Sequence, residues 1–156
     1  AALYTLRTED MGEWRFKVEA TYVDEFVYST LDFDEDGNEI TTTQFFEGTW
    51  TQPHWRANGT IAWNYGDWAA SLFIDFVGEY EQLDGDDQDA YGNVKAYWRF
   101  NPQVAFSGFW DTTITVGVRN VFDEAPPLDL GDVTNVNNSL HNAEPRFVYV
   151  RFSKDW

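Results

Sequence analysis

The chain has 156 residues and a formal net charge of −17, and aromatic residues make up 19% of it. It contains no cysteine, which excludes disulfides, thiolate metal sites and cysteine nucleophiles. The high aromatic content argues against a disordered acidic chain. Its ten scattered Lys and Arg residues argue against a nucleic-acid binder, which needs a basic face. We therefore expect an ordered domain with no nucleic-acid partner.

Signals for a membrane helix and for export are both missing. Apolar stretches such as 73–74 are only a few residues long, against the roughly 20 residues that a spanning helix needs. Residues 1–10 have neither the basic start nor the apolar segment of a signal peptide. An exported protein would therefore have lost its signal, or the chain begins inside a longer protein.

Period-two alternation of apolar and polar residues recurs along the chain and indicates β-strands. Trp14, Phe16 and Val18, for example, alternate with charged residues, and Leu72 and Ile74 continue the same pattern in a later segment. The alternation predicts seven strands at roughly 1–8, 13–29, 54–64, 67–80, 92–100, 112–121 and 145–156.

The predicted connections differ in length and charge. Links 9–12 and 64–67 are short, and 101–111, with Pro102 and Gly108, is a longer link on the same side. The connections near 30–53, 81–91 and 122–144 are long and polar. Segments 31–40, 81–90 and 121–144 hold fifteen acidic residues and no Lys or Arg. Short links on one side and long polar loops on the other are typical of a transmembrane β-barrel.

Aromatic residues fall near the predicted strand ends. Trp14, Tyr65 and Trp68 lie beside the short links, whereas Tyr22, Phe76 and Tyr80 lie toward the long loops. Trp and Tyr favour both membrane–water boundaries, because each has an apolar body and a polar tip. A soluble β-sandwich also has one apolar face on every strand, so the alternation alone leaves that alternative open. The loop asymmetry and the aromatic ends favour the barrel.

Residues 113–127, TITVGVRNVFDEAPP, resemble a motif near the end of TonB-dependent outer-membrane receptors, a strand followed by G-V-x-N-L-F-D-x-x-P-P. The residues that fit it are Gly117, Asn120, Phe122, Asp123, Pro126 and Pro127. Residues 53–80 resemble further stretches of that family, and 146–156 resembles its closing strand. That strand also resembles the signal read by the barrel-assembly machinery, carried here by Val148, Val150, Phe152 and Trp156. Lys154 departs from the usual apolar residue.

The resemblance implies an all-β, antiparallel transmembrane β-barrel, with residues 1–156 as about seven C-terminal strands of a barrel of about 22. It places the C-terminus at the periplasmic side and the three long loops outside the cell. The plug domain and the earlier strands would be supplied by the same or a separate chain. The implied localisation is the Gram-negative outer membrane, in contact with lipid and lipopolysaccharide.

The implied function is active import of a bulky, scarce nutrient: an iron chelate, a cobalamin or an oligosaccharide. Energy would come from TonB–ExbB–ExbD, contacted through the missing N-terminal part, and no cofactor is implied. The acidic loops argue weakly against an anionic ferric chelate. A soluble carbohydrate-binding β-sandwich and a passive porin-like pore segment remain alternatives. No catalytic residue is assigned, so we do not expect an enzyme.

Other candidate sites have simpler interpretations. Asp32, Asp34 and Asp36 begin like a calcium loop, but Thr43 stands where a bidentate Glu is needed, so a solvated loop is favoured. The acidic cluster at 84–89 is also interpreted as a solvated loop, and the distant His54 and His141 do not suggest a catalytic dyad. Charged residues predicted to face the lumen, or to form salt bridges across strands, are Arg15, Lys17, Glu19, Asp75, Lys95, Arg99, Arg119 and Arg151.

Overall fold

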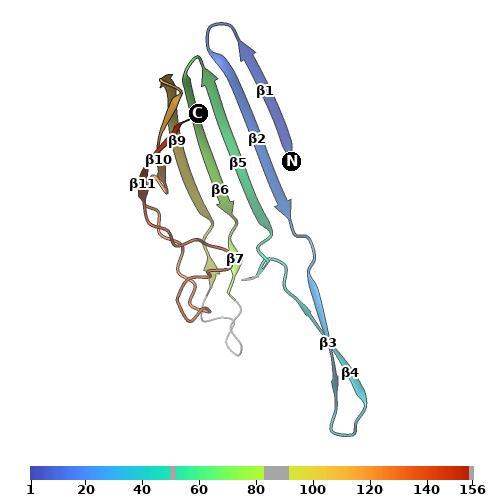
Figure 1. The fold of residues 1–156 in the computed structure, drawn as a ribbon. Helices are drawn as coiled ribbons and strands as arrows, with labels where there is room; N and C mark the ends of the chain where they lie inside the picture. Colours follow the sequence, from blue (N-terminus) through green and yellow to red (C-terminus); the bar gives the residue numbers. More distant parts are fainter. Residues whose placement is uncertain (50–51, 83–91, 155–156) are drawn as a thin grey trace.

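The computed structural model describes residues 1–49, 52–82 and 92–154, and this part of the chain is built from β-strands without a helix. One seven-stranded antiparallel sheet dominates it (Figure 1). In spatial order its strands are β1 (Ala2–Thr8), β2 (Gly12–Tyr22), β5 (Trp55–Tyr65), β6 (Trp68–Val77), β9 (Tyr97–Phe109), β10 (Thr112–Arg119) and β11 (Phe147–Lys154). No helix of the described residues is long and apolar enough to cross a membrane.

The predicted all-β, antiparallel class is confirmed. Each of the seven predicted strands corresponds, in chain order, to one strand of the sheet, and every strand pairs with its predecessor in the sheet. Among the described residues the sheet is open, because β1 and β11 each have a single neighbour. The described part of the chain therefore forms no closed barrel.

The asymmetry of the connections is also confirmed (Figure 1). Short turns join β1 to β2, β5 to β6 and β9 to β10 at the end of the sheet drawn uppermost, where β11 also finishes. The three long connections leave from the opposite end. We call these the short-turn end and the long-loop end.

The predicted boundary between strand 92–100 and link 101–111 is wrong, because β9 begins at Tyr97 and continues to Phe109. Its pairing with β10 begins only at Gln103, so Pro102 lies beyond the part of β9 that β10 pairs with, where a missing N–H is tolerated. Gly108 lies in a β-bulge, where Phe106 and Phe109 pair with Ile114 and Thr112. The real link is Trp110–Asp111, and both have positive φ, 42° and 55°, as a tight hairpin turn requires.

The predicted strand 13–29 is also wrong in its second half. β2 ends at Tyr22, where the backbone N–H of Val23 donates to the carbonyl of His54. The chain then enters a separate hairpin, β3 (Val27–Phe33) with β4 (Glu39–Phe45), which projects from the long-loop end (Figure 1). The period of two stops here, because Tyr22 and Val23 are both apolar and Asp24 and Glu25 both polar, so the sequence does carry a signal for this break. A second, short pair, β7 (Tyr80–Glu81) with β8 (Asn93–Val94), lies in the next long connection.

The register divides the sheet into two chemically different faces. Directly paired residues point to the same side, and the pairs place Val18, Gly59, Ile74 and Phe100 in one continuous row. Neighbouring rows on that side are also apolar, which defines the apolar face. The alternate residues form the polar face, on which Glu19, Asn58, Asp75 and Arg99 lie in one row. The predicted alternation is therefore confirmed strand by strand.

The small buried core lies away from both broad faces. Val77, Tyr80, Val94 and Leu140 form the buried apolar cluster, and all belong to the long-loop end. In contrast, side chains along the apolar face are open: Trp55 is 50% exposed, Val150 54% and Phe152 70%. Each strand of the large sheet contacts only its lateral neighbours. No second layer of the described chain covers the apolar face.

Candidate functional site

Aromatic rings gather at both ends of the apolar face. At the short-turn end, the rings of Trp14 and Trp63 lie 6.1 Å apart, and those of Trp68 and Phe106 lie 4.7 Å apart. At the long-loop end, Tyr22 and Trp55 lie 4.7 Å apart, and Phe76 and Trp98 lie 4.2 Å apart. The rows between these two bands hold mostly aliphatic residues and glycine. Such an arrangement suits a hydrocarbon layer bounded by two polar interfaces.

The strands are long enough for that layer. β2, β5, β6 and β9 have 11, 11, 10 and 13 residues, against about 5–6 in a usual globular strand and about 9–11 in a membrane-crossing one. Trp55 and Trp63 lie eight residues apart on β5, which corresponds to about 26 Å along the strand. Strands of membrane barrels are tilted by about 35–45°, so this length crosses roughly 20 Å, close to an apolar membrane band of about 25 Å.

The polar face carries most of the charged residues predicted to line a lumen. The register places Arg15, Lys17, Glu19, Asp75, Arg99, Arg119 and Arg151 on it. Several pair locally: Lys17 with Glu19 at 3.0 Å, and Arg99 with Asp75 across β6 and β9 at 3.5 Å. Lys95 does not belong to this set, because it lies before β9 and outside the sheet. The predicted place of Lys95 on a strand of the large sheet is therefore wrong.

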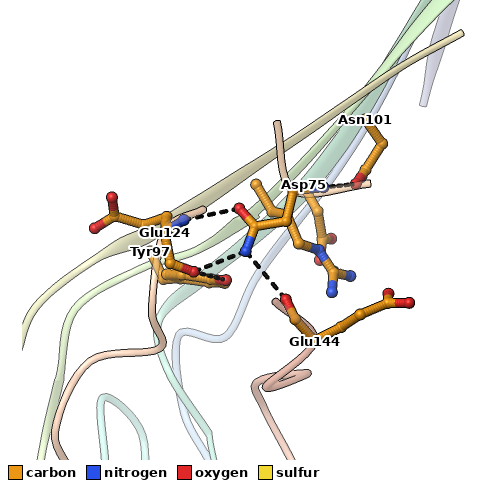
Figure 2. A network of polar contacts seen from close by, with 7 residues as sticks. Asp75, Tyr97, Asn101, Glu124 and Glu144 are labelled. Carbon is orange, nitrogen blue, oxygen red and sulfur yellow. Dashed lines mark hydrogen bonds and ion pairs between the residues drawn. The ribbon is translucent and has the colours of Figure 1, made fainter. Parts of the chain in front are cut away.

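Asn120, one of the motif residues, lies in a buried polar network at the long-loop end, where its partners are Asn101, Glu124 and Glu144, which Figure 2 labels. It is 1% exposed and has a φ of 50°. Its backbone N–H donates to Oδ1 of Asn101 at 2.9 Å, and its Nδ2 donates to the carbonyls of Glu124 and Glu144 at 2.9 and 3.1 Å. Its Oδ1 accepts from the N–H of Glu124 at 2.9 Å. Asn120 thus links β9, through its backbone N–H, to both ends of the last long connection, through its side-chain amide.

Two further motif residues have structural roles nearby. A Cβ on Gly117 would clash with the ring of Tyr149, so the absent side chain leaves the space that this ring fills across the strand pair. The Tyr149 hydroxyl donates to Oε1 of Gln103 at 2.9 Å. Oδ1 of Asp123 accepts from the N–H of Arg146 at 2.7 Å. This bond fixes the residue directly before β11 to the segment that follows β10.

The remaining motif residues are less constrained. The ring of Phe122 is 70% exposed and meets Phe100 edge-on at 5.4 Å, so it extends the aromatic band of the long-loop end. Pro126 and Pro127 are half-buried in the irregular segment after β10. Of the predicted assembly signal, Val148, Val150 and Phe152 lie on the apolar face of β11. Trp156 lies outside the described residues.

Tyr80 is not part of an exposed aromatic band, as the sequence suggested, but is 2% exposed inside the loops. Its hydroxyl donates to Oδ2 of Asp129 at 2.9 Å and lies 3.3 Å from Nε2 of His141. Burial and the neighbouring Asp129 carboxylate raise the pKa of Tyr80, and burial lowers the pKa of His141, with Asp129 opposing the shift. This cluster fastens the segment around 129–141 against β7.

The acidic segments divide into a described and an undescribed part. Oδ1 of Asp34 accepts from the N–H groups of Asp36 and Asn38 at 3.0 and 2.8 Å, and its Oδ2 accepts from Nδ2 of Asn38 at 3.0 Å. Both oxygens therefore stabilise the β3–β4 turn. The cluster at 84–89 lies outside the described residues. Within the described ranges no group of three or more His, Cys, Asp or Glu residues is arranged to hold a metal ion.

Sequence reasoning missed several polar residues of the long-loop end. The alternation assigns Asn101 and Gln103 to a link, although they lie on β9 and point to the polar face. In the sequence Tyr97 is only one of the alternating residues, yet its hydroxyl donates to the Glu124 carbonyl at 3.1 Å (Figure 2). The pairing of a strand glycine with a cross-strand tyrosine is a usable signal, but it requires the register to be known.

Comparisons with protein-family models, with curated proteins and with solved structures found no match.

Two replacements of Asn120 distinguish the contribution of its side-chain hydrogen bonds to stability from that of its backbone conformation. Asn120→Ala removes the three side-chain hydrogen bonds. It also places alanine at a φ of 50°, in the left-handed region that alanine adopts less readily than asparagine. We expect a loss of about 2–4 kcal/mol in the free energy of unfolding, measured by chemical denaturation. Asn120→Gly loses the same bonds but tolerates the conformation, so it should be less destabilising. Equal stability of Asn120→Ala and the unchanged protein would contradict the role.

The His141 cluster predicts weaker docking of its loop at acid pH. The lowered pKa in the folded state means that an undocked His141 binds a proton more readily. This contribution to docking is therefore fully present above about pH 6.5, the ordinary value, and declines as the pH falls below it. Amide hydrogen exchange over 128–142, corrected for intrinsic rates, should show less protection at pH 5 than at pH 7.5.

Two variants control that experiment. In His141→Phe the ring remains but cannot be protonated, so the difference in protection should disappear. In His54→Gln the changed residue lies outside the cluster, with Nδ1 of His54 2.9 Å from the Val23 carbonyl oxygen, and the difference should remain. A pH dependence that persists in His141→Phe would rule out His141 as its source.

Proposed function

We propose that this chain forms part of a transmembrane β-barrel in a Gram-negative outer membrane and serves the uptake of a bulky nutrient. The observation that supports this most directly is the apolar face, which continues over seven strands, has no second layer over it among the described residues and ends in an aromatic band on each side. Fully burying one large apolar side chain stabilises by about 1.5–3 kcal/mol. A face of this extent therefore needs an apolar covering, and lipid suits the band spacing and the strand lengths.

The open edges define what else the barrel requires. Within the described residues β1 and β11 are separated by five intervening strands, and each neighbour is antiparallel, so β1 and β11 run in the same direction. Joining them to one another would create a parallel seam. A fully antiparallel barrel, with its even number of strands, therefore needs an odd number of additional strands between these edges. Unpaired edge groups in lipid cost several kcal/mol each, which favours a partner segment.

Transport coupled to TonB is proposed from the resemblance of 113–127 and 146–156 to TonB-dependent receptors. The partners would then be the remaining barrel strands and a plug domain, together with TonB–ExbB–ExbD. Orientation follows from the same resemblance: the short-turn end faces the periplasm, and the acidic connections face outward. The charged polar face would line the lumen. An upstream or neighbouring plug-encoding region would support this proposal over a passive pore.

An arginine in the middle of the apolar face tests the membrane assignment. Ile74 lies in the central row, beside Gly59 and Phe100. We expect Ile74→Arg to lower the free energy of unfolding in lipid vesicles by about 2–4 kcal/mol, because the charge would enter hydrocarbon. The measurement is urea unfolding in vesicles, followed by tryptophan fluorescence.

Asn58→Arg is the matched control, since its cross-strand neighbours on the polar face are Glu19 and Asp75. The new charge would meet opposite charges and water, so the change in unfolding free energy should be small. If the two variants are equally stable in vesicles, the apolar face does not contact lipid.

A further inference from the structure

A cleft on the polar face has the size of a small-molecule site. Its volume is about 380 Å³, within the roughly 300–1,000 Å³ of ligand pockets. β6, β9, β10, β11 and the segment before β11 contribute its walls, among them Arg99, Asn101, Arg119, Asn142 and Tyr149. All of these residues belong to the described chain. The cleft does not include the apolar face, so ligand binding in it does not depend on what covers that face.

Most acceptor oxygens in the cleft are already used by the protein. Oδ1 of Asn101 accepts from the Asn120 N–H, and Oε1 of Gln103 accepts from the Tyr149 hydroxyl, both at 2.9 Å. Oε1 of Glu144 accepts from Nη1 of Arg119, also at 2.9 Å. These pairings leave over Oε2 of Glu144 and the amide of Asn142, and a larger number of donors: the Asn101 amide N–H groups and the N–H groups of the two guanidinium groups. The cleft is therefore suited to a ligand rich in acceptors.

Arg99 is the least satisfied of these donors. Its side chain is only 14% exposed, and its ion pair from Nη2 to Oδ2 of Asp75 is long at 3.5 Å. Its Nε and Nη1 are shielded from solvent and have no hydrogen-bond partner among the residues that the structure describes. Leaving N–H groups of a charged side chain unpaired in a buried position is costly. A small movement that opens Arg99 toward the cleft would let a ligand oxygen satisfy them.

We propose that this cleft binds a solute through an oxyanion, a carboxylate or phosphate group, with Arg99 as the main ligand and Arg119 beside it. A planar guanidinium matches the geometry of both groups and forms stronger hydrogen bonds to them than to neutral oxygens. The acidic loops would slow the approach of an anion. Their repulsion is screened over about 10 Å in salt, and the donors of the cleft act at contact.

Calorimetric titration of the full chain, in a medium that keeps it monodisperse, tests this proposal. The probes are citrate for carboxylate, inorganic phosphate for phosphate, and maltose as a neutral polyhydroxyl solute. We expect citrate or phosphate to bind, maltose not to bind, and added NaCl to weaken the binding. The anion that binds more tightly identifies the source of the oxyanion.

Variants then locate the site. Arg99→Gln should weaken binding about tenfold or more, whereas Arg15→Gln, on the same face but paired with Glu13, should leave it unchanged. Glu144→Gln should strengthen binding, because it frees Arg119. Should Arg99→Gln fail to fold by circular dichroism, Arg119→Gln should weaken binding in its place.

Three results would overturn the proposal: no binding of either anion, binding of maltose as tight as that of the anions, or unchanged affinity in a folded Arg99 or Arg119 variant. None of them bears on the lipid contact, which the Ile74 and Asn58 variants test separately.

Discussion

The apolar face of the seven-stranded sheet is the constraint on which the rest of this molecule depends. Its rows hold no charged residue between the two aromatic bands, and the described chain forms no second layer over them. In water such a face would drive aggregation. Everything else in the architecture fits a sheet whose apolar side meets a layer about as thick as a membrane: long strands, aromatic bands at both ends, and bulky polar connections at one end only.

The long-loop end stabilises the molecule in a different way. There the chain does form a small interior, in which Asn120 binds the two ends of a long connection and Tyr80 shares hydrogen-bond contacts with Asp129 and His141. These polar groups are buried and mostly satisfied, so they specify one arrangement of the loops. They also position the polar wall formed by β9, β10 and β11. Hydrogen bonds thus fix these loops to the end of the sheet.

Strand order, face assignment and loop asymmetry could be predicted, because a period of two reports directly which side a residue faces. The length of β9 could not be predicted, because Pro102 and Gly108 are turn signals whose effect depends on the neighbouring strand. Pro102 lies beyond the pairing with β10, and Gly108 lies in a bulge. The burial of Tyr80 and the unsatisfied groups of Arg99 depend on contacts between distant segments. No local pattern encodes those, although the motif around Asn120 marked the right region.

Single-cysteine scanning of β6 is the sharpest test of lipid contact at the apolar face, because the chain has no cysteine of its own. Spin labels at successive positions from 70 to 76 would be measured in lipid vesicles for collision with oxygen, which dissolves in hydrocarbon, and with a water-soluble nickel chelate. We expect oxygen access to peak at Leu72 and Ile74, with nickel access at the alternate residues. Low access of both reagents at Leu72 and Ile74 would mean that protein, and not lipid, covers this face.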